Sequence, residues 1–247
     1  MASTAPVPRV AVAPLTPDGP VQSLTRRIIE LLRVEPEGLV VDLDCRDLRP
    51  AQAMPEEIRP RTQRVASSPF GERLAFLLIT SGVRMVQMGA LTFGRVPMRY
   101  ERVVLRDGFS QFKASLRRRL ATVLSQLDPA GRVLIVESAP SPDAPLFAEG
   151  LRRWSRQHRS PEVIAELMRE AGFSAQVETV ECLRRVSVAE CYTWVEARDW
   201  PILASFREAE LQRGLCELRA RYGAQHLVDF TSRFELVLGT KPEALAS

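Results

Sequence analysis

Apolar residues recur at helical spacing in three parts of the chain. In VQSLTRRIIELLRVEPEG, near the N-terminus, they fall on one helical face, and the prolines and glycine that follow stop the pattern. A second stretch begins at Ser110, a good N-cap, and ends at Pro129 and Gly131. The third stretch, SPEVIAELMREAGF, has Ser160 as its cap and Gly172 at its stop. The pattern predicts a helix in each of the three.

Shorter apolar runs lie between and after these helices. They occur in Leu39–Leu43, around Val103–Leu105, and in RVLIVES, and each predicts a buried strand. Strands are also predicted at the start of RVASSPFGERLAFLLITSG, before a turn and a helix, and in GVRMVQMGA, SAQVETVECLRRVSV and HLVDFTSRFELVLGTKP. Strands that alternate with helices predict a parallel, doubly wound α/β sheet.

One segment breaks this alternation because of its prolines. The sequence RPAQAMPEEIRPRTQ carries Pro50, Pro55 and Pro60. Each interior proline removes a helix hydrogen bond and clashes with the preceding turn, at a cost of about 3 kcal/mol. We therefore expect an irregular segment, and no continuous helix, from Arg49 to Gln63.

Length and composition indicate one large α/β domain. The chain has 247 residues, of which 45% are hydrophobic, and this is enough apolar material to bury a core. Residues 1–20 are rich in proline and alanine and are expected to form a flexible arm. The domain is expected to span residues 21–247. Within it, residues 188–225 are mostly helical by pattern and are expected to form an insertion or lid.

Charge and cysteine content narrow the classes of partner and compartment. The net charge of +4 fits an acidic ligand, but such an excess is more typical of a solvated surface, so nucleic acid is not the expected partner. Four cysteines without CxxC spacing and only two histidines do not favour a metal site, and they fit a reducing compartment. No apolar stretch reaches the length of a membrane span, and no leader pattern is visible. We expect a soluble, cytoplasmic protein that uses no metal.

The second half of the chain carries an ordered series of motifs. YERVVLRDGFSQF is followed by LSQLDPAGRVLIVE, then by SPEVIAELMREAGF, and finally by FELVLGTKP. In this order they resemble the fourth strand, the fifth strand with its preceding helix, the late helix and the last strand of class I S-adenosylmethionine-dependent methyltransferases of the small-molecule type. The first motif has Tyr100-Glu101 for the usual Phe-Asp, and Ala130 replaces one glycine of the second. The resemblance implies a Rossmann-like methyltransferase fold with S-adenosylmethionine as cofactor. Its sheet would be mostly parallel, with a helical insertion before a last antiparallel strand.

The loop that would hold this cofactor departs from the family. The family has a stretch of the Asp-Leu-Gly-Cys-Gly-Thr-Gly type, whereas this chain has Asp42-Leu43-Asp44-Cys45-Arg46-Asp47-Leu48. Glycine lets the backbone take positive φ values and approach the ligand closely. Here all three glycine positions carry side chains.

Two acidic positions of the family are also replaced. Ala66 stands where an acid at the end of the second strand binds the ribose hydroxyls, and Gly89 stands where an acid lies near the adenine. The resemblance implies that the cofactor region includes Asp42, Asp44, Cys45, Arg46, Ala66, Ser67, Gly89, Ala90 and Arg106. Because the loop and both acids depart together, we expect the S-adenosylmethionine site to be altered or lost.

Candidates for catalysis are few. Asp42 and Asp44, two apart on a strand, are positioned as a carboxylate pair, although a bond from Asp42 to a nearby backbone amide is the favoured interpretation. Cys45 has no histidine near it in sequence and is expected to be a small buried residue. His158 is a candidate general base, but a histidine between arginines is more typical of a surface. The catalytic residue is therefore unknown.

Aromatic residues gather where this family covers its pocket. Trp154, Tyr192, Trp194 and Trp200, with Arg198, are the candidate residues for a substrate or a partner. The same aromatics are equally suited to packing the inserted helices or to a homodimer contact, and the sequence leaves both open. Two functions therefore compete: a methyltransferase-like protein acting on a small molecule, and a non-catalytic member that binds a protein partner or another ligand.

Overall fold

The computed structural model describes residues 9–11, 20–33, 39–43, 61–66, 78–80, 83–87, 99–106 and 116–242. Its strands are β1 (Arg9–Ala11), β2 (Leu39–Leu43), β3 (Arg61–Ala66), β4 (Leu78–Thr80), β5 (Val83–Gln87), β6 (Tyr100–Arg106), β7 (Leu127–Ser138), β8 (Ser174–Ser187) and β9 (Leu227–Thr240). Its helices are α1 (Pro20–Leu32), α4 (Leu116–Gln126), α5 (Ala148–Gln157), α6 (Pro161–Glu170), α7 (Val188–Glu196), the 3-10 turn η2 (Pro201–Ser205) and α8 (Glu208–Tyr222).

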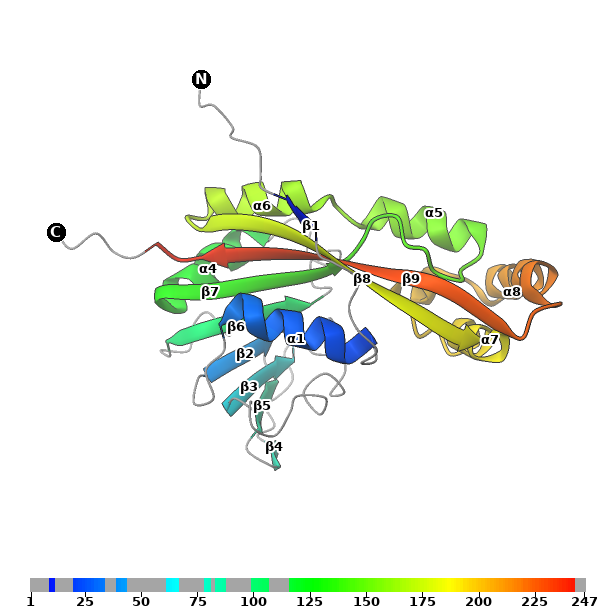
Figure 1. Cartoon of the computed structure of the whole chain (residues 1–247), viewed down its shortest axis with the longest axis horizontal. Helices are drawn as coiled ribbons and strands as arrows, with labels where there is room; N and C mark the ends of the chain where they lie inside the picture. The colour runs from blue at the N-terminus through cyan, green and yellow to red at the C-terminus, as the bar shows by residue number, and fades with distance from the viewer. Residues whose placement is uncertain are drawn as a thin grey trace, which may run out of the picture. The chain divides into compact units, whose positions relative to one another are not determined.

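The described strands form one open sheet in the order β1-β8-β9-β7-β6-β2-β3-β5-β4 (Figure 1). Strand β2 is parallel to both β3 and β6, and β3 is parallel to β5. Strand β6 is parallel to β7, whereas β4 runs antiparallel to β5 at the edge. The chain therefore proceeds from β2 to one side of the sheet and returns to β6 on the other side. This is a doubly wound arrangement with a switch point between β2 and β6.

The two long strands β8 and β9 are antiparallel neighbours (Figure 1). The Ser174 hydroxyl on β8 donates to the Thr240 carbonyl on β9, and farther along β8 the Arg185 guanidinium pairs with Asp229. Residue numbers that rise along β8 are thus matched by numbers that fall along β9. The predicted strands in both segments and the predicted antiparallel last strand are confirmed.

The chain divides into two compact units. The first unit holds residues 1–137, 160–180 and 235–247, and the second holds residues 138–159 and 181–234. The segment 188–225, expected to be an insertion, is mostly helical as predicted, since it contains α7, η2 and α8. It belongs to the second unit together with α5.

The core of the first unit has helices on both faces of the sheet (Figure 1). Val133 and Ile135 of β7 are fully buried and cluster with the apolar residues of α4 and α6, such as Leu120 and Ile164. On the other face, the Arg132 guanidinium donates to the Leu31 carbonyl of α1. Alternate residues of β7 therefore point to opposite helix layers, as a strand buried on both faces requires.

The core of the second unit is built on aromatic contacts. The Phe147 and Phe206 rings meet edge to face with 5.1 Å between centroids. A Cβ atom at Gly214 of α8 would lie 2.4 Å from the Phe147 ring, so only glycine fits there. Buried leucines of α8 and the Trp154 ring complete this cluster. The second unit therefore has an apolar core of its own.

Several sequence predictions match the structure closely. The strand predicted at Leu39–Leu43 has the same bounds as β2. The helices predicted in the N-terminal stretch and in SPEVIAELMREAGF are α1 and α6. Of the stretch expected to be a flexible arm, residues 9–11 form β1, parallel to β8. No unbroken helix reaches Gln63, because residues 61–63 belong to β3; residues 49–60 lie outside the described part.

Two predictions need correction. The helix expected to run to Leu127 ends at Gln126, and Leu127 begins β7 because it pairs with Tyr100 of β6. Pro129 and Gly131 therefore lie within a strand, next to Ala130 with a φ of 58°. The helix expected after residue 69 is replaced at residues 78–80 by β4, which pairs with β5. Ser160 is the N-cap residue of α6, as predicted, although its side chain makes no capping hydrogen bond.

Candidate functional site

The carboxyl ends of four parallel strands meet at one edge of the sheet. Leu43 of β2 lies beside Val65 of β3 and Leu105 of β6, and Ala66 of β3 lies beside Gln87 of β5. Ligands of open α/β sheets bind outside such strand ends, at the switch point. Here the switch point falls between β2 and β6, so this edge is the candidate cofactor site.

The predicted cofactor residues take defined places at this edge where the structure describes them. Asp42 is the penultimate residue of β2, opposite Arg64 and Val104 on the flanking strands. Ala66 is the last residue of β3, and Arg106 is the last residue of β6. Six of the predicted residues lie outside the described part of the chain, namely Asp44, Cys45, Arg46, Ser67, Gly89 and Ala90.

Ala66 bears directly on whether S-adenosylmethionine fits this edge. The end of β3 is the position from which a carboxylate would accept hydrogen bonds from the ribose hydroxyls. An alanine methyl group has no hydrogen-bonding atom. Among the described residues of β3, its last residue Ala66 therefore offers no such acceptor.

The second unit holds the other predicted candidates. The Trp154 side chain is 7% exposed, and its indole Nε1–H donates to the Ala139 carbonyl at 2.9 Å. The His158 ring stacks on it, with centroids 4.5 Å apart and planes 12° apart. His158 Nδ1 lies 2.9 Å from the Trp154 carbonyl, which can only accept, so the proton of this contact is on Nδ1. Trp154 and His158 thus share one stacked, hydrogen-bonded arrangement at the end of α5.

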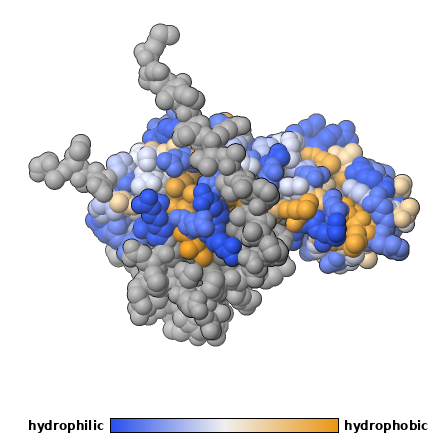
Figure 2. Space-filling view, viewed as in Figure 1, coloured by the Kyte–Doolittle hydropathy of each residue, from blue (hydrophilic) through white to orange (hydrophobic). Residues whose placement is uncertain are grey.

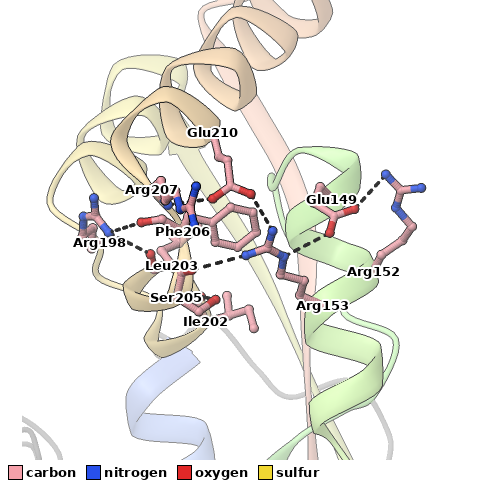
Figure 3. Close-up of polar contacts among 10 residues, drawn as sticks. All are labelled: Glu149, Arg152, Arg153, Arg198, Ile202, Leu203, Ser205, Phe206, Arg207 and Glu210. Atoms are coloured by element: carbon pink, nitrogen blue, oxygen red, sulfur yellow. Dashed lines mark hydrogen bonds and ion pairs between the residues drawn. The ribbon is translucent and has the colours of Figure 1, made fainter.

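Arg153 is the centre of a polar network between α5, η2 and α8 (Figure 3). Its Nε–H donates to Glu149 at 3.0 Å, and its two terminal nitrogens donate to the Ser205 carbonyl and to Glu210. Its guanidinium carbon lies 3.8 Å from the centre of the Phe206 ring. One side chain therefore connects three elements of the second unit.

This network lowers the pKa of both carboxyl groups. The pKa of Glu149 lies below its ordinary value, mainly because of the hydrogen bond from Arg153. The pKa of Glu210 is also lowered, first by the hydrogen bond from the Arg207 backbone and then by Arg153. Both groups are ionised at neutral pH, as charge-assisted hydrogen bonds favour. The network is therefore built of fixed charges.

Arg198 is engaged in a second network of the same unit (Figure 3). Its guanidinium donates to the Leu203 and Phe206 carbonyls, at 3.2 and 2.7 Å, and pairs with Glu208 at 3.3 Å. These contacts bind carbonyls at the end of η2. Most of its donors are thus used within the chain.

Trp194 and Trp200, which are half-buried, form an aromatic cluster with the buried Phe230. The Trp194 ring meets Trp200 edge to face at 5.6 Å and Phe230 at 6.4 Å. The Arg184 guanidinium carbon lies 5.8 Å from the centres of both the Trp194 and Phe230 rings. Within the described part of the chain, this guanidinium makes no hydrogen bond or ion pair. The cluster therefore combines aromatic faces with a cation whose donors are open to a ligand.

Tyr192 lies between the two apolar clusters of the second unit. Its ring has the Arg219 guanidinium carbon 5.6 Å from its centre. Its hydroxyl is buried and has no hydrogen-bond partner among the described residues.

Sequence reasoning singled out the tryptophans but missed Arg153, which lies over the Phe206 ring, and Arg184, which lies near the Trp194 and Phe230 rings. Arg153 carries a local signal, since it lies one turn after Glu149 on α5. Arg184 has no such local signal, because the rings that it contacts belong to α7 and β9. Its position opposite Phe230 appears only once β8 and β9 are paired.

Among the described residues, no group of three or more His, Cys, Asp or Glu side chains is arranged to hold a metal ion. In the same part of the chain, the helices are all too short or too polar to cross a bilayer.

Comparison with known proteins finds likeness at the level of structure. No protein-family model matches the sequence, and no curated protein matches it. A putative methyltransferase of an antibiotic biosynthesis pathway from Anabaena variabilis has 13% identity and a TM-score of 0.58, covering 86% of this chain and 95% of that one. The cyclase SpnF has 13% identity and a TM-score of 0.51, covering 90% of this chain and 81% of that one.

A third similar structure contains the cofactor. Phosphoethanolamine N-methyltransferase 2 of Haemonchus contortus, in complex with S-adenosyl-L-methionine, has 15% identity and a TM-score of 0.51, with 89% of this chain covered. The chain spans about half the length of that protein, since 52% of it is covered. Identities this low establish the fold alone. The strand order and these likenesses confirm the predicted fold: the chain has the Rossmann-like fold of class I S-adenosylmethionine-dependent methyltransferases.

Proposed function

We propose that this chain is a class I methyltransferase-like protein whose S-adenosylmethionine site is altered, and that it acts as a binding subunit without methyl transfer. The observation that carries the proposal is Ala66 at the end of β3, at the switch-point edge of the sheet. A methyl group there cannot accept a hydrogen bond from a ribose hydroxyl.

The sequence next to this edge supports the same proposal. Asp44 and Arg46 follow β2, where the resembled family has glycines that let the backbone approach the ligand. Gly89 follows β5 where that family has an acid. Loss of the close approach and of both acceptors removes the main means by which the fold holds this cofactor.

The proposed binding surface consists of the half-buried Arg184, Trp194 and Trp200 in the second unit, with the buried Phe230 ring packed against Trp194. Tryptophan and arginine are the residues most enriched among binding hot spots. The Arg184 guanidinium, held over two rings, offers its donors to a carboxylate of a small ligand or of a protein partner. The solved structures similar to this chain include a cyclase, so methyl transfer does not follow from the fold.

A second candidate function is methyl transfer to a small molecule. It is favoured by the likeness to the Haemonchus contortus enzyme, which binds S-adenosyl-L-methionine. In that case the chain would contribute proximity and exclusion of water to an in-line transfer. The cofactor would supply the activated methyl group.

Thermal unfolding with added ligand separates the two functions. A ligand present at 100 times its dissociation constant adds about 2.7 kcal/mol to the free energy of unfolding. We expect neither S-adenosylmethionine nor S-adenosylhomocysteine to raise the melting temperature. A clear rise with either would support the enzyme and contradict the binding subunit.

A further inference from the structure

Among the described strands, none pairs with the outer edge of β8 over half of its length. Strand β1 pairs with β8 only at Val177–Thr179. In the part of the chain that the structure describes, no strand pairs with this edge from Glu181 to Ser187. This half of β8 contains neither proline nor lysine, the residues that most often protect a strand edge from pairing.

The odd-numbered residues of β8 direct their backbone groups to this edge. Val188 N–H donates to the His226 carbonyl, directly after β8 and before β9. In an antiparallel pair, every second residue forms backbone hydrogen bonds to the partner strand. Counting back from Val188, the even-numbered residues of β8 form these bonds with β9. The side-chain pairs of Arg185 with Asp229 and of Ser174 with Thr240 keep the same register, so no bulge interrupts it. Glu181, Leu183 and Arg185 therefore present their N–H and C=O groups outward.

The same three residues share one face of the strand. The Leu183 side chain is 72% exposed, the most exposed large hydrophobic residue among those described. It lies between Glu181, which pairs with Arg233, and Arg185, which pairs with Asp229 at 2.6 Å. Figure 2 shows hydrophobic and hydrophilic residues side by side on the surface over this end of β8 and over α7. An apolar residue is thus flanked along the edge by opposite charges.

We propose that this edge pairs with the same edge of a second copy of the chain, antiparallel and centred on Leu183. Leu183 then lies opposite Leu183 of the second copy, and Glu181 lies opposite Arg185 of that copy. By symmetry Arg185 lies opposite the second copy's Glu181. The arrangement is a two-fold symmetric contact, in which the same patch serves both subunits.

Charge selects this register. In the proposed dimer, β9 and β8 of one copy lie next to β8 and β9 of the second copy. The charges across these four strands then alternate in sign, in the order Arg233, Glu181, Arg185 of the second copy and Asp229 of the second copy. Opposite charges placed across paired strands stabilise a sheet, and like charges destabilise it. A shift centred on Arg184 would place Arg184 opposite its own copy and would leave Glu181 opposite a serine. The pairing centred on Leu183 is therefore the favoured one.

The paired segment has natural limits at both ends. Toward the start of β8, the edge at Val177–Thr179 is occupied by β1. Toward its end, α7 begins at Val188. Pairing from Glu181 to Arg185 fits between these limits and satisfies the outward backbone groups of all three odd-numbered residues.

Two charge-reversed variants of the full chain test the proposal by sedimentation equilibrium. The wild type is expected to have twice the mass of one chain at high concentration. E181R places two arginines opposite each other, and R185E places two glutamates opposite each other, so each variant alone is expected to be a monomer. When the two variants are mixed, every cross-strand charge pair becomes complementary, and the dimer is expected to return. R213E, at an exposed arginine of α8, is the matched control and is expected to remain dimeric.

The outcomes decide the proposal in either direction. The proposal is overturned if the wild type is monomeric or if both single variants remain dimeric. It is also overturned if the mixture stays monomeric or if the control variant is monomeric. Each reversal breaks one exposed ion pair within its own chain, so circular dichroism is used to confirm folding. If either variant fails to fold, L183K replaces both, because it places two ammonium groups opposite each other at an exposed position. A dimeric L183K protein would also overturn the proposal.

Discussion

The guanidinium of Arg153 stacks on the ring of Phe206, 3.8 Å from its centre. In the same position it bonds two carboxylates and one backbone carbonyl, so its charge, its donors and its flat face are all used. This arrangement depends on the planar fork of arginine, which lysine does not have. It connects the helices of the second unit, beside the aromatic cluster that we propose as a binding surface.

Replacement of Arg153 tests the structural role of this network. R153M keeps an apolar contact with Phe206 but removes every hydrogen bond, so the melting temperature is expected to fall. R152M is the matched control, because Arg152 lies next to it on α5 with a single ion pair and a 65% exposed side chain. An equal effect of the two variants on melting would contradict the central role of Arg153.

The same network predicts a pH dependence of stability. Glu149 and Glu210 have lowered pKa values in the folded chain, so the unfolded chain binds more protons near the ordinary glutamate pKa of about 4.3. The contribution of these two groups to the free energy of unfolding should therefore be fully present above that pH. It should be lost as the pH falls through their lower pKa values in the folded chain. Urea unfolding from pH 7 to pH 3 measures this decrease. In R153M the decrease should be smaller, and an unchanged pH profile would show that Arg153 does not cause it.

Two helical glycines of the second unit should respond oppositely to alanine. At Gly214 a Cβ would lie 2.4 Å from the Phe147 ring, so G214A is expected to destabilise the chain by about 1–3 kcal/mol. At Gly150 the nearest atom would be 3.6 Å away, and G150A is expected to stabilise α5 by about 0.5–1 kcal/mol. Denaturant unfolding of both variants gives the comparison. The same sign for both would show that the contact with Phe147 is not limiting.

Alanine substitutions at two tryptophans distinguish a role in packing from a role in binding. Trp154 is buried and hydrogen-bonded through its indole, so W154A is expected to cost about 3–5 kcal/mol of stability. Trp194 is only partly buried and belongs to the aromatic cluster with Arg184. W194A is expected to lose less stability than W154A, while it abolishes binding of a partner recovered with the wild-type chain. If melting of W194A falls as far as that of W154A, the cluster is a packing feature.

Local patterns were sufficient to predict some elements of the fold. The run at Leu39–Leu43 is bounded by glycine and polar residues, and it has the same bounds in the structure. The helical stripe that ends at Leu127 was misleading, because Leu127 pairs with Tyr100 of a neighbouring strand. Pairing between distant residues decided that boundary, and no local pattern records it.

In the candidate sites, too, local sequence predicted some features, whereas contacts between distant residues could not be predicted. Ala66 could be assigned to the end of a strand from its surroundings in sequence, and β3 does end there. The partners of Arg153 on α8 could not be assigned, because Glu210 lies 57 residues away in the chain. The open edge of β8 is likewise visible only when the strand order is known.

Calorimetric titration of the full chain with S-adenosylmethionine tests the proposed loss of the cofactor site most directly. We expect no saturable heat, because Ala66 offers the ribose hydroxyls no acceptor and the positions after β2 carry side chains in place of glycine. S-adenosylhomocysteine should behave in the same way. Saturable binding with a micromolar or lower dissociation constant would contradict the proposed loss of the cofactor site.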